Sequence, residues 1–330
     1  MTGSAESAVT MQAVRFHEFG EPADVLVMEA VSLPQPDAGR IRVRVIACGL
    51  NPADWALCRG LFAGKMPRGV GLDVCGIVDA IGEDVQDVAV GDTVLGAADY
   101  AGCTSAGAAE QAILKHWTLV PAGLSPENAA AIPLSAETAF RSIESLEVRH
   151  GHTVLIHGAG TTVGFAAVQL ALLKGARVIA TAGTTHSAKL AELGARVTAY
   201  GDGIVERVMA LADGPVDLVL DTAPPSNVLP ELVEIAGGDP KRVLTITDFV
   251  AANELGVRHT FSEGHPERWD MLEEFAKLAA EGKLFVPIAE VFPLRAWRKA
   301  MEISLSGHAR GKLILKPDLR NARLDQTYAE

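Results

Sequence analysis

A glycine-rich segment in the middle of the chain, HGAGTTVG at residues 157–164, has the residue types that bind phosphate groups. Apolar runs precede and follow it, so it should connect a strand to a helix. Gly158 and Gly160 would let the backbone approach a pyrophosphate, and the free N–H groups at the helix start would attract its charge. Gly164 would let the helix and the strand pack closely. The spacing Gly-x-Gly-x-x-x-Gly is unspecific alone, but its place between a strand and a helix predicts a dinucleotide site.

The end of the next apolar run, residues 177–181, indicates which dinucleotide would bind. An NAD site usually has Asp or Glu there, because a carboxylate accepts a hydrogen bond from the ribose 2′-OH. Here the run is followed by small hydroxyl residues, a histidine and a lysine, and by no acid. Such side chains suit a 2′-phosphate and so predict NADPH. The candidates are Gly183, Thr184, Thr185, His186 and Lys189. Alternatively, Lys189 is a plain surface residue and His186 a plain loop residue.

Length and charge restrict the class of protein that carries this site. The chain has 330 residues, which is typical of two domains. It contains 29 Lys and Arg against 41 Asp and Glu, so the formal charge is −12. Nucleic acids and anionic membrane surfaces are bound by basic patches, which an acidic chain is unsuited to form. We therefore expect a small-molecule substrate, and neither nucleic acid nor membrane as a partner.

The N-terminal segment and the cysteines indicate a reducing compartment. Residues 1–10 have neither the basic nor the apolar region of a secretory signal. Cys48, Cys58, Cys75 and Cys103 contain no Cys-x-x-Cys pair and suggest no disulfide framework. These features predict a cytoplasmic protein with structural thiols.

The elements around the glycine segment fall into two groups. In the first third, short apolar runs such as 40–48 and 75–81 are separated by glycines and prolines, which indicates an antiparallel, barrel-like domain. Ser125 before Pro126 is typical of a helix start. From residue 153 onward strands and helices alternate, and the strands are continuous apolar runs, as in a parallel sheet covered on both faces. The fold class is therefore predicted to be α/β.

Motifs spread along the chain carry a resemblance to a known family. They are NPADW at 51–55, GLD at 71–73, VGDTV at 90–94, GAAE at 107–110, ENAAAIPLSAET at 127–138, the stretch 157–171 and GKLIL at 311–315. In these motifs and their order the chain resembles the medium-chain dehydrogenase/reductase family, in its zinc-independent, quinone oxidoreductase-like branch. The resemblance implies a GroES-like β-barrel catalytic domain made from residues 1–130 with 287–330. It also implies a Rossmann domain at 131–286 and a cleft between the two domains.

The resemblance further implies residues of an NADPH site. Gly158, Gly160 and Val163 match the pyrophosphate loop of the family, and Tyr200 matches a tyrosine near the adenosine phosphate. Other positions that match the surroundings of the cofactor are Asn51, Thr138, Thr247, Gly311 and Lys312. The pair Thr161 and Thr162 departs from the family, which usually has glycines there. Their side chains would either crowd the pyrophosphate or bond it through their hydroxyls.

The residues at the family's metal-ligand positions disfavour zinc. Catalytic zinc needs Cys, His or carboxylate ligands. The zinc-using relatives have a cysteine where this chain has Asn51 and a histidine where it has Leu72. Glu110, Asp73 and Cys48 are near in the sequence, but they do not make a ligand set. We therefore expect no metal.

Without a metal, hydride should go to an acceptor that needs little electrophilic help, such as a quinone or an α,β-unsaturated carbonyl. Negative charge then develops on the acceptor oxygen, where a preorganised donor stabilises it. Asn51 is the candidate donor, unless its side chain only bonds the local backbone. Tyr100 is the candidate proton donor, with solvent as the alternative. Trp55 and Phe62 are candidates for an apolar pocket wall, or for plain core packing.

Together these features predict a zinc-independent, NADPH-dependent reductase of quinones or conjugated carbonyls. Two alternatives stay open: a zinc-type alcohol dehydrogenase with unusual ligands, and a protein that binds NADPH without turnover. Because homodimers through the outer edge of the Rossmann sheet are common in the family, we expect a homodimer. The loops around 55–66, 97–107 and 248–266, which would form the pocket, contain no motif that identifies the substrate.

Overall fold

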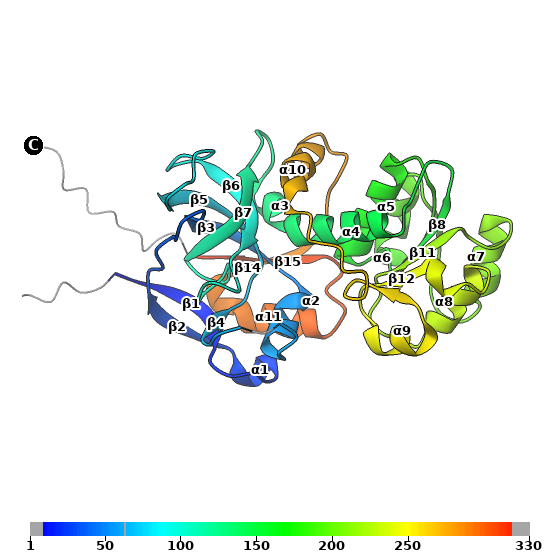
Figure 1. Ribbon diagram of the computed structural model, residues 1–330, viewed down its shortest axis with the longest axis horizontal. Coiled ribbons are helices and arrows are strands. Elements are labelled where there is room, and N and C mark those ends of the chain that lie inside the picture. Colours follow the sequence, from blue (N-terminus) through cyan, green and yellow to red (C-terminus); the bar gives the residue numbers. More distant parts are fainter. Residues whose placement is uncertain (1–8, 63, 319–330) are drawn as a thin grey trace, which may run out of the picture.

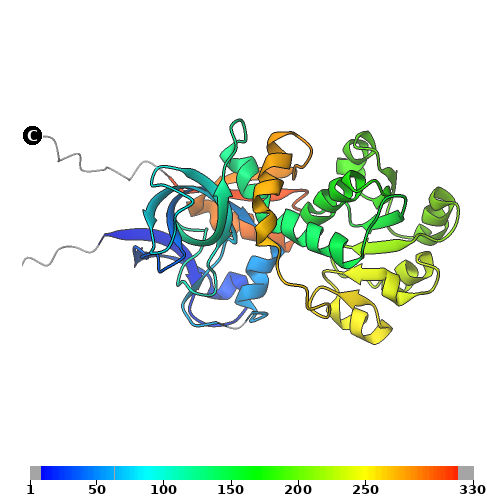
Figure 2. The same cartoon turned by 45° about the horizontal axis from the view of Figure 1, so that its top comes forward.

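The computed structural model describes residues 9–62 and 64–318, which form two halves side by side (Figure 1). One half, at left, is built mostly on antiparallel strands, and the other, at right, on a parallel sheet with helices. The helix α4 (Pro133–Ser145) runs from the boundary into the second half in both views (Figure 2). The predicted α/β class is confirmed.

A curled six-stranded sheet is the frame of the first half. Its order is β14-β15-β3-β5-β6-β7, and β3 also pairs with β7, which brings the sheet round on itself. The strands are β3 (Ile41–Leu50), β5 (Asp73–Ile81), β6 (Thr93–Ala98), β7 (Gln111–Leu119), β14 (Ile288–Pro293) and β15 (Lys312–Lys316). Buried and half-buried residues alternate along most of β3, as its charged–apolar pattern predicts. The last two strands come from the far end of the chain, which agrees with a first half assembled from two segments.

Smaller elements complete the first half. A second sheet has the order β2-β1-β4, with β1 (Thr10–Phe16), β2 (Val27–Ser32) and β4 (Arg68–Gly69). The helices are α1 (Pro22–Val25), α2 (Pro52–Cys58), α3 (Pro126–Ala131) and α11 (Trp297–Leu305). The helix start expected at Ser125 is present, because its hydroxyl accepts from the Asn128 N–H at 3.3 Å. Cys48 and Cys75 are fully buried in the cores, as expected of structural thiols.

The second half is a parallel sheet of the order β10-β9-β8-β11-β12-β13. Its strands are β8 (Thr153–His157), β9 (Arg177–Thr181), β10 (Arg196–Thr198), β11 (Leu218–Asp221), β12 (Val243–Thr245) and β13 (Arg258–His259). The order reverses between β8 and β11, so the crevice for a ligand should lie at the carboxyl ends of these strands. This is the Rossmann-like arrangement that the alternating pattern predicts.

Helices cover both faces of the parallel sheet. Around the sheet lie α5 (Thr162–Leu173), α6 (Thr184–Glu192), α7 (Ile204–Ala212), α8 (Leu229–Ile235), α9 (Phe249–Leu255) and α10 (Leu272–Ala280). α4, α5 and α10 share one apolar core, and α7, α8 and α9 pack over the opposite face. α6 begins at Thr184, directly after the glycine that caps it. Within the described ranges, no helix is long and apolar enough to cross a membrane.

Candidate active site

A buried cluster of Asn51, Asp73 and Lys312 lies beside α4. Asn51 is the residue before α2, Asp73 begins β5 and Lys312 begins β15. All three are at most 4% exposed. Lys312 Nζ donates to Asn51 Oδ1 at 2.5 Å and to Asp73 Oδ2 at 2.6 Å. Three segments that are far apart in the sequence therefore meet at one ammonium.

The first turn of α4 completes this cluster. Ser135 Oγ lies 3.2 Å from Lys312 Nζ and accepts its third hydrogen bond. The Leu134 N–H donates to Asp73 Oδ1 at 2.8 Å. The ammonium thus has a partner for each of its three protons, and the carboxylate has one for each oxygen. Such full hydrogen bonding best offsets the desolvation of a buried ion pair.

The side chains considered above as possible zinc ligands, or at zinc-ligand positions, make other contacts in the structure. Asn51 accepts from an ammonium, and Leu72 is an apolar residue 6% exposed. Glu110 Oε2 accepts from the Gln12 N–H at 2.7 Å. Burial raises the pKa of the Cys48 thiol, so the side chain packs in the core as a neutral group. Over residues 9–62 and 64–318, no three His, Cys, Asp or Glu side chains are grouped to hold a metal ion.

Asn51 is held in one orientation by contacts on all sides. Its Nδ2 donates to Asp73 Oδ2 at 3.0 Å and lies 3.4 Å from the Gly49 carbonyl oxygen. Its backbone N–H donates to Asp54 Oδ2 at 2.7 Å, which forms a capping box on α2. Burial raises the pKa of the Asp54 carboxyl to about 7. The amide expected to face an acceptor oxygen is therefore shared with Asp73 in this structure.

The turn between β8 and α5 has a backbone that suits a pyrophosphate. Gly158 has φ +75°, and a Cβ there would lie 2.6 Å from the Ala223 nitrogen, so a side chain is excluded. A Cβ on Gly160 would meet only the His186 ring, at 3.5 Å, which leaves this side of the turn open. A Cβ on Gly164 would lie 2.4 Å from the Gly158 oxygen. Helix and turn are thus in the close contact expected from the third glycine.

The two threonines of the turn have different surroundings. Thr161 Oγ1 accepts from the Gly164 N–H at 3.0 Å and so caps α5, and it lies 3.1 Å from Thr222 Oγ1. Thr162 and Val163 are the first two residues of α5, where backbone N–H groups have no partner within a helix. The Thr161 hydroxyl therefore has a role besides crowding or bonding the pyrophosphate. It stabilises α5, the helix whose N-terminus the phosphate would use.

Below the turn, a buried histidine connects β8 to β9. His157 Nδ1 lies 2.9 Å from Thr181 Oγ1, and the same hydroxyl accepts from the Gly158 N–H at 3.0 Å. His157 is 3% exposed, and burial lowers its pKa to about 4. The imidazole is therefore neutral at pH 7 and supports the turn as a hydrogen-bonding group.

The residues expected near a 2′-phosphate gather at the start of α6. Gly183 is the N-cap of α6, and Thr184 and Thr185 are its exposed first residues. A Cβ on Gly183 would lie 3.7 Å from the Tyr200 hydroxyl, so the tyrosine ring stands beside the cap. Tyr200 itself is 63% exposed. One loop after β9 and one after β10 thus face the same space.

His186 and Lys189 lie on α6 with different partners. His186 Nε2 lies 3.1 Å from the Arg310 carbonyl oxygen, and its ring stands edge-on to Phe165 at 5.7 Å. Lys189 forms an exposed ion pair with Glu192 at 3.0 Å. The sequence analysis missed Arg310, an exposed cation in left-handed backbone (φ +56°) directly before Gly311. The sequence feature that could have identified Arg310 is its position directly before Gly311 and Lys312.

The remaining cofactor candidates lie on three segments. Thr138 is half-buried on α4, and its hydroxyl lies 3.3 Å from Glu137 Oε2. Thr247 follows β12 and donates to the Ala223 carbonyl oxygen at 2.6 Å. Gly311 has φ +140°, and a Cβ there would lie 2.6 Å from the Pro287 carbonyl oxygen. Thr247 therefore lies by the same backbone segment that contacts the Gly158 turn.

The three aromatic candidates have two kinds of environment. Trp55 is 3% exposed, packs in the core of the first half and donates from Nε1 to Ser304 Oγ at 2.7 Å. Phe62 and Tyr100 are half-buried, with ring centroids 6.1 Å apart. The Phe62 ring also contacts Phe261 of the second half at 6.0 Å. Phe261 was missed because its loop, 248–266, contains no recognisable motif.

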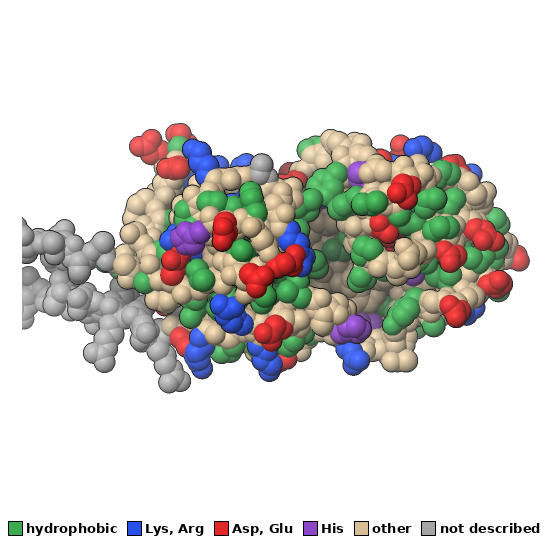
Figure 3. Space-filling view, turned by 90° about the horizontal axis from the view of Figure 1, so that it is seen from below, with side chains coloured by type: hydrophobic (Ala, Val, Ile, Leu, Met, Phe, Trp, Pro, Cys, Tyr) green, Lys and Arg blue, Asp and Glu red, His purple; other side chains and the backbone are tan. Residues whose placement is uncertain are grey.

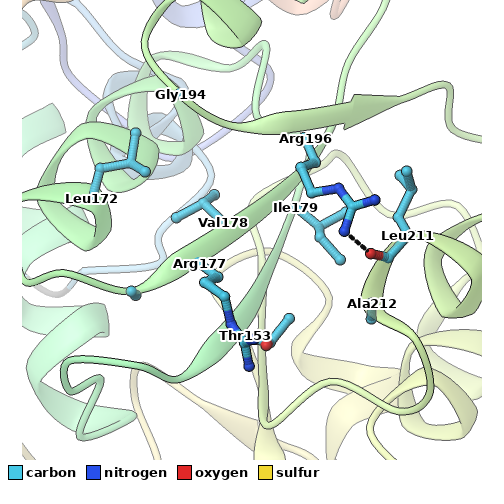
Figure 4. A pocket seen from close by; sticks show the side chains of 10 residues that line it. Thr153, Leu172, Arg177, Val178, Ile179, Gly194, Arg196, Leu211 and Ala212 are labelled. Carbon is cyan, nitrogen blue, oxygen red and sulfur yellow. Dashed lines mark hydrogen bonds between the residues drawn. The ribbon is translucent and has the colours of Figure 1, made fainter.

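A hollow separates the two halves on the face seen from below (Figure 3). Two pockets lie elsewhere. One of about 250 Å³ is at the amino ends of β8 and β9, where Arg196 donates to the Leu211 carbonyl oxygen (Figure 4). The other, of about 480 Å³, lies by His116 and Trp269, whose rings stack at 5.7 Å. In a Rossmann fold ligands bind at the carboxyl ends of the strands, so the 250 Å³ cavity is at the wrong edge for the cofactor.

Comparisons with known proteins agree with this geometry. Residues 37–125 match the alcohol dehydrogenase GroES-like domain, and residues 193–315 match the zinc-binding dehydrogenase family model. The quinone oxidoreductase of Sus scrofa is 32% identical, over 92% of this chain and 97% of its own. The chain belongs to the medium-chain dehydrogenase/reductase family, in its quinone oxidoreductase-like branch.

Solved structures of this family superpose on most of the chain. The quinone oxidoreductase from Coxiella burnetii is 28% identical, with a TM-score of 0.72 over 93% of this chain and 99% of its own. An NAD-dependent alcohol dehydrogenase is 26% identical, with a TM-score of 0.80 over 93% of this chain and 99% of its own. The protein is thus an oxidoreductase of a family that uses a nicotinamide cofactor, and the GroES-like and Rossmann-like halves are confirmed.

Proposed function

We propose that the protein is a zinc-independent, NADPH-dependent reductase of quinones or α,β-unsaturated carbonyls. The observation that carries the proposal is the buried ion pair of Lys312 and Asp73, which holds Asn51, the residue that stands where the resemblance puts a zinc ligand. A site built in this way favours acceptors that take hydride without a Lewis acid. The family membership and the relatives named quinone oxidoreductase support the same reaction class.

The glycine turn and the segments around it fit a dinucleotide. The open side of Gly160 leaves room for the pyrophosphate, and the free N–H groups of Thr162 and Val163 carry the positive end of the α5 dipole. Asn51, Thr138, Thr247, Gly311 and Lys312 would border the nicotinamide. When bound, NADPH supplies the hydride that the acceptor receives and leaves as NADP⁺.

Each reduction also needs a proton for the acceptor oxygen or carbon. Burial raises the pKa of the Tyr100 phenol, which keeps the group protonated at neutral pH. Tyr100 stands next to Phe62 at the substrate end proposed below, so it is the candidate donor, with solvent resupplying the proton.

Preference for NADPH is proposed to come from the start of α6. The Lys189–Glu192 pair is exposed and contributes little, so a phosphate can take its place. His186, with Thr184, Thr185 and Tyr200 around Gly183, provides hydrogen bonds at the same place. No acid of the kind that binds a ribose 2′-OH follows β9 within residues 182–191.

A fluorescence titration of metal-stripped protein with NADPH and with NADH tests this proposal, followed by addition of 1,4-benzoquinone. Wild type should bind NADPH selectively and oxidise it rapidly. The double variant His186→Ala/Lys189→Ala should weaken NADPH binding about tenfold or more and NADH binding far less, because charge-assisted bonds to the phosphate are lost.

Lys283→Ala is the matched control, since Lys283 forms an exposed ion pair with Glu281 outside the site. It should leave both affinities unchanged. Equal weakening of both nucleotides by the double variant would assign His186 and Lys189 to structure. Failure of the wild type to bind either nucleotide would contradict the proposal that the protein is an NADPH-dependent enzyme. Loss of turnover on metal removal would favour a zinc-dependent dehydrogenase.

A further inference from the structure

A row of aromatic rings crosses the boundary between the two halves. Tyr100 and Phe62 of the first half have centroids 6.1 Å apart, and Phe62 stands edge-on to Phe261 at 6.0 Å. Phe261 continues to Phe249 at 4.9 Å, also edge-on. Phe249 begins α9 and Phe261 follows β13, so both belong to the cofactor-binding half. Four loops or helix starts thus contribute one continuous aromatic row.

The four rings of this row are partly exposed to solvent, unlike the side chains of a hydrophobic core. Phe261 is 52% exposed, and Phe62, Tyr100 and Phe249 are half-buried. In Figure 1, α2 and α9 stand on opposite sides of the boundary, and the row connects the segments next to them. Partly exposed rings on both sides of an interdomain boundary can pair with a further flat ring, because aromatic pairs associate over centroid distances of about 4.5–7 Å.

A buried arginine holds two members of the row. Arg68, in β4, is 1% exposed and donates to the Phe62 carbonyl oxygen at 2.6 Å and to the Tyr100 carbonyl oxygen at 3.4 Å. Its guanidinium carbon lies 6.0 Å from the Tyr100 ring centroid. One side chain therefore connects two loops that are separated in the sequence and that carry neighbouring rings.

Within the described residues, the positive charge of Arg68 is not neutralised by an ion pair. In the described ranges its Nε has no hydrogen-bond partner, and no carboxylate pairs with the guanidinium. An unpaired buried cation destabilises a fold unless its hydrogen bonds offset the desolvation. Its bonds go to the backbones of Phe62 and Tyr100, so placing these two rings is what the residue achieves.

We propose that Phe62, Tyr100, Phe249 and Phe261 form an aromatic platform for the acceptor, and that Arg68 is its positioning residue. The platform selects flat conjugated ring systems, such as two-ring quinones, over small aliphatic enals. The inference rests on the proposed function, since the acceptor is reduced at the same cleft. Phe249 and Phe261 lie in the cofactor-binding half and Phe62 and Tyr100 in the other, so the platform is complete only when the halves are in contact.

Phe261→Leu tests the platform, because it keeps an apolar side chain and removes the ring. Steady-state kinetics with 1,4-naphthoquinone and with 2-butenal at saturating NADPH compare the two acceptor classes. For naphthoquinone kcat/KM should fall about three- to tenfold, mainly through KM, which corresponds to the loss of one aromatic pair. For 2-butenal it should change less than about twofold. Equal losses for both acceptors, or none, would overturn the proposal.

Arg68→Met and Arg68→Lys test the positioning role. Arg68→Met should raise KM for naphthoquinone selectively while kcat changes less, and Arg68→Lys should restore part of the selectivity. A merely structural role would lower kcat for both acceptors alike. The matched control is Arg59→Met, since Arg59 forms an exposed ion pair with Glu21 at 2.8 Å. If Arg68→Met does not fold, the Phe261→Leu result decides.

Calorimetric titration with 2-naphthol, a flat aromatic compound that is not reduced, tests the aromatic platform independently of the proposed reductase activity. Wild type loaded with NADP⁺ should bind 2-naphthol, and Phe261→Leu should bind it about three- to tenfold more weakly. Binding with no turnover of any acceptor would contradict the reductase and keep the platform. Turnover of 2-butenal with no binding of 2-naphthol would contradict the platform alone.

Discussion

Two buried polar side chains, Lys312 and His157, are hydrogen-bonded to neighbours from distant segments of the chain. Lys312 has three oxygen partners, and His157 shares a hydroxyl with the glycine turn. The sequence indicated Asn51 and Lys312 as site residues only through the family resemblance. It placed Asp73 nearby without a role, because an isolated acid gives no sign of whether it will meet a cation.

Replacing Lys312 by methionine should lower the free energy of unfolding by about 3–5 kcal/mol. The substitution leaves Asp73 buried as an unpaired charge, which is the costly half of a buried ion pair. Urea denaturation measures the change. Lys316→Met is the control, because the Lys316–Glu127 pair is partly exposed and contributes at most about 1 kcal/mol. Similar losses in the two variants would show that the ion pair at Lys312 is not the stabilising contact.

His157 should make the protein less stable in mild acid. Its pKa is about 4 when folded, against an ordinary 6.5, so between these values only the unfolded chain binds the proton. Its contribution is therefore full above pH 6.5 and lost as the pH falls toward 4, by about 1.4 kcal/mol per unit. From pH 7.5 to 5.0, wild type should lose about 2 kcal/mol more than His157→Asn in urea denaturation. His308→Asn, at an exposed histidine, should follow wild type; a parallel profile for His157→Asn would refute the prediction.

At the scale of elements, the local sequence pattern predicts which strands and helices form, but not which of their residues come into contact. The strand at 153–157, the glycine turn and α5 follow from apolar runs and glycine spacing, and the structure has them at nearly the same residues. The polar cluster depends instead on strand register. Gly49 pairs with Asp73 between β3 and β5, and Leu50 pairs with Leu313 between β15 and β3. Such register is set by the whole sheet, so no window of sequence contains it.

The start of α5 offers a test of the turn as an element. Thr161→Ala removes the cap to the Gly164 N–H and should lower the free energy of unfolding by about 1 kcal/mol. Thr161→Ser keeps the hydroxyl and should stay close to wild type. Urea denaturation and NADPH titration of both variants separate the two roles of this residue. Unchanged stability with weaker NADPH binding in Thr161→Ala would mean that the hydroxyl serves the nucleotide instead.

At the scale of the whole molecule, the division into two halves was predictable and the contacts between them were not. The change from short Gly-punctuated strands to alternating strands and helices marks the division, and the family motifs place the last strands with the first half. The aromatic row and the Arg310–His186 contact depend on loop residues such as Phe261 and Arg310, whose segments have no periodicity to recognise. The boundaries 1–130 with 287–330 and 131–286, and the homodimer, stay predictions.

The position of Lys312 in the chain has a consequence for how the protein is made. Asn51 and Asp73 leave the ribosome early, the whole Rossmann-like half follows, and β15 comes after it. Domains generally fold in the order of their synthesis, so the nucleotide-binding half can be complete while Asp73 still lacks its cation. The contact that joins Asn51, β5 and α4 through one ammonium therefore forms late in synthesis, after the parallel sheet between them and β15 has been made.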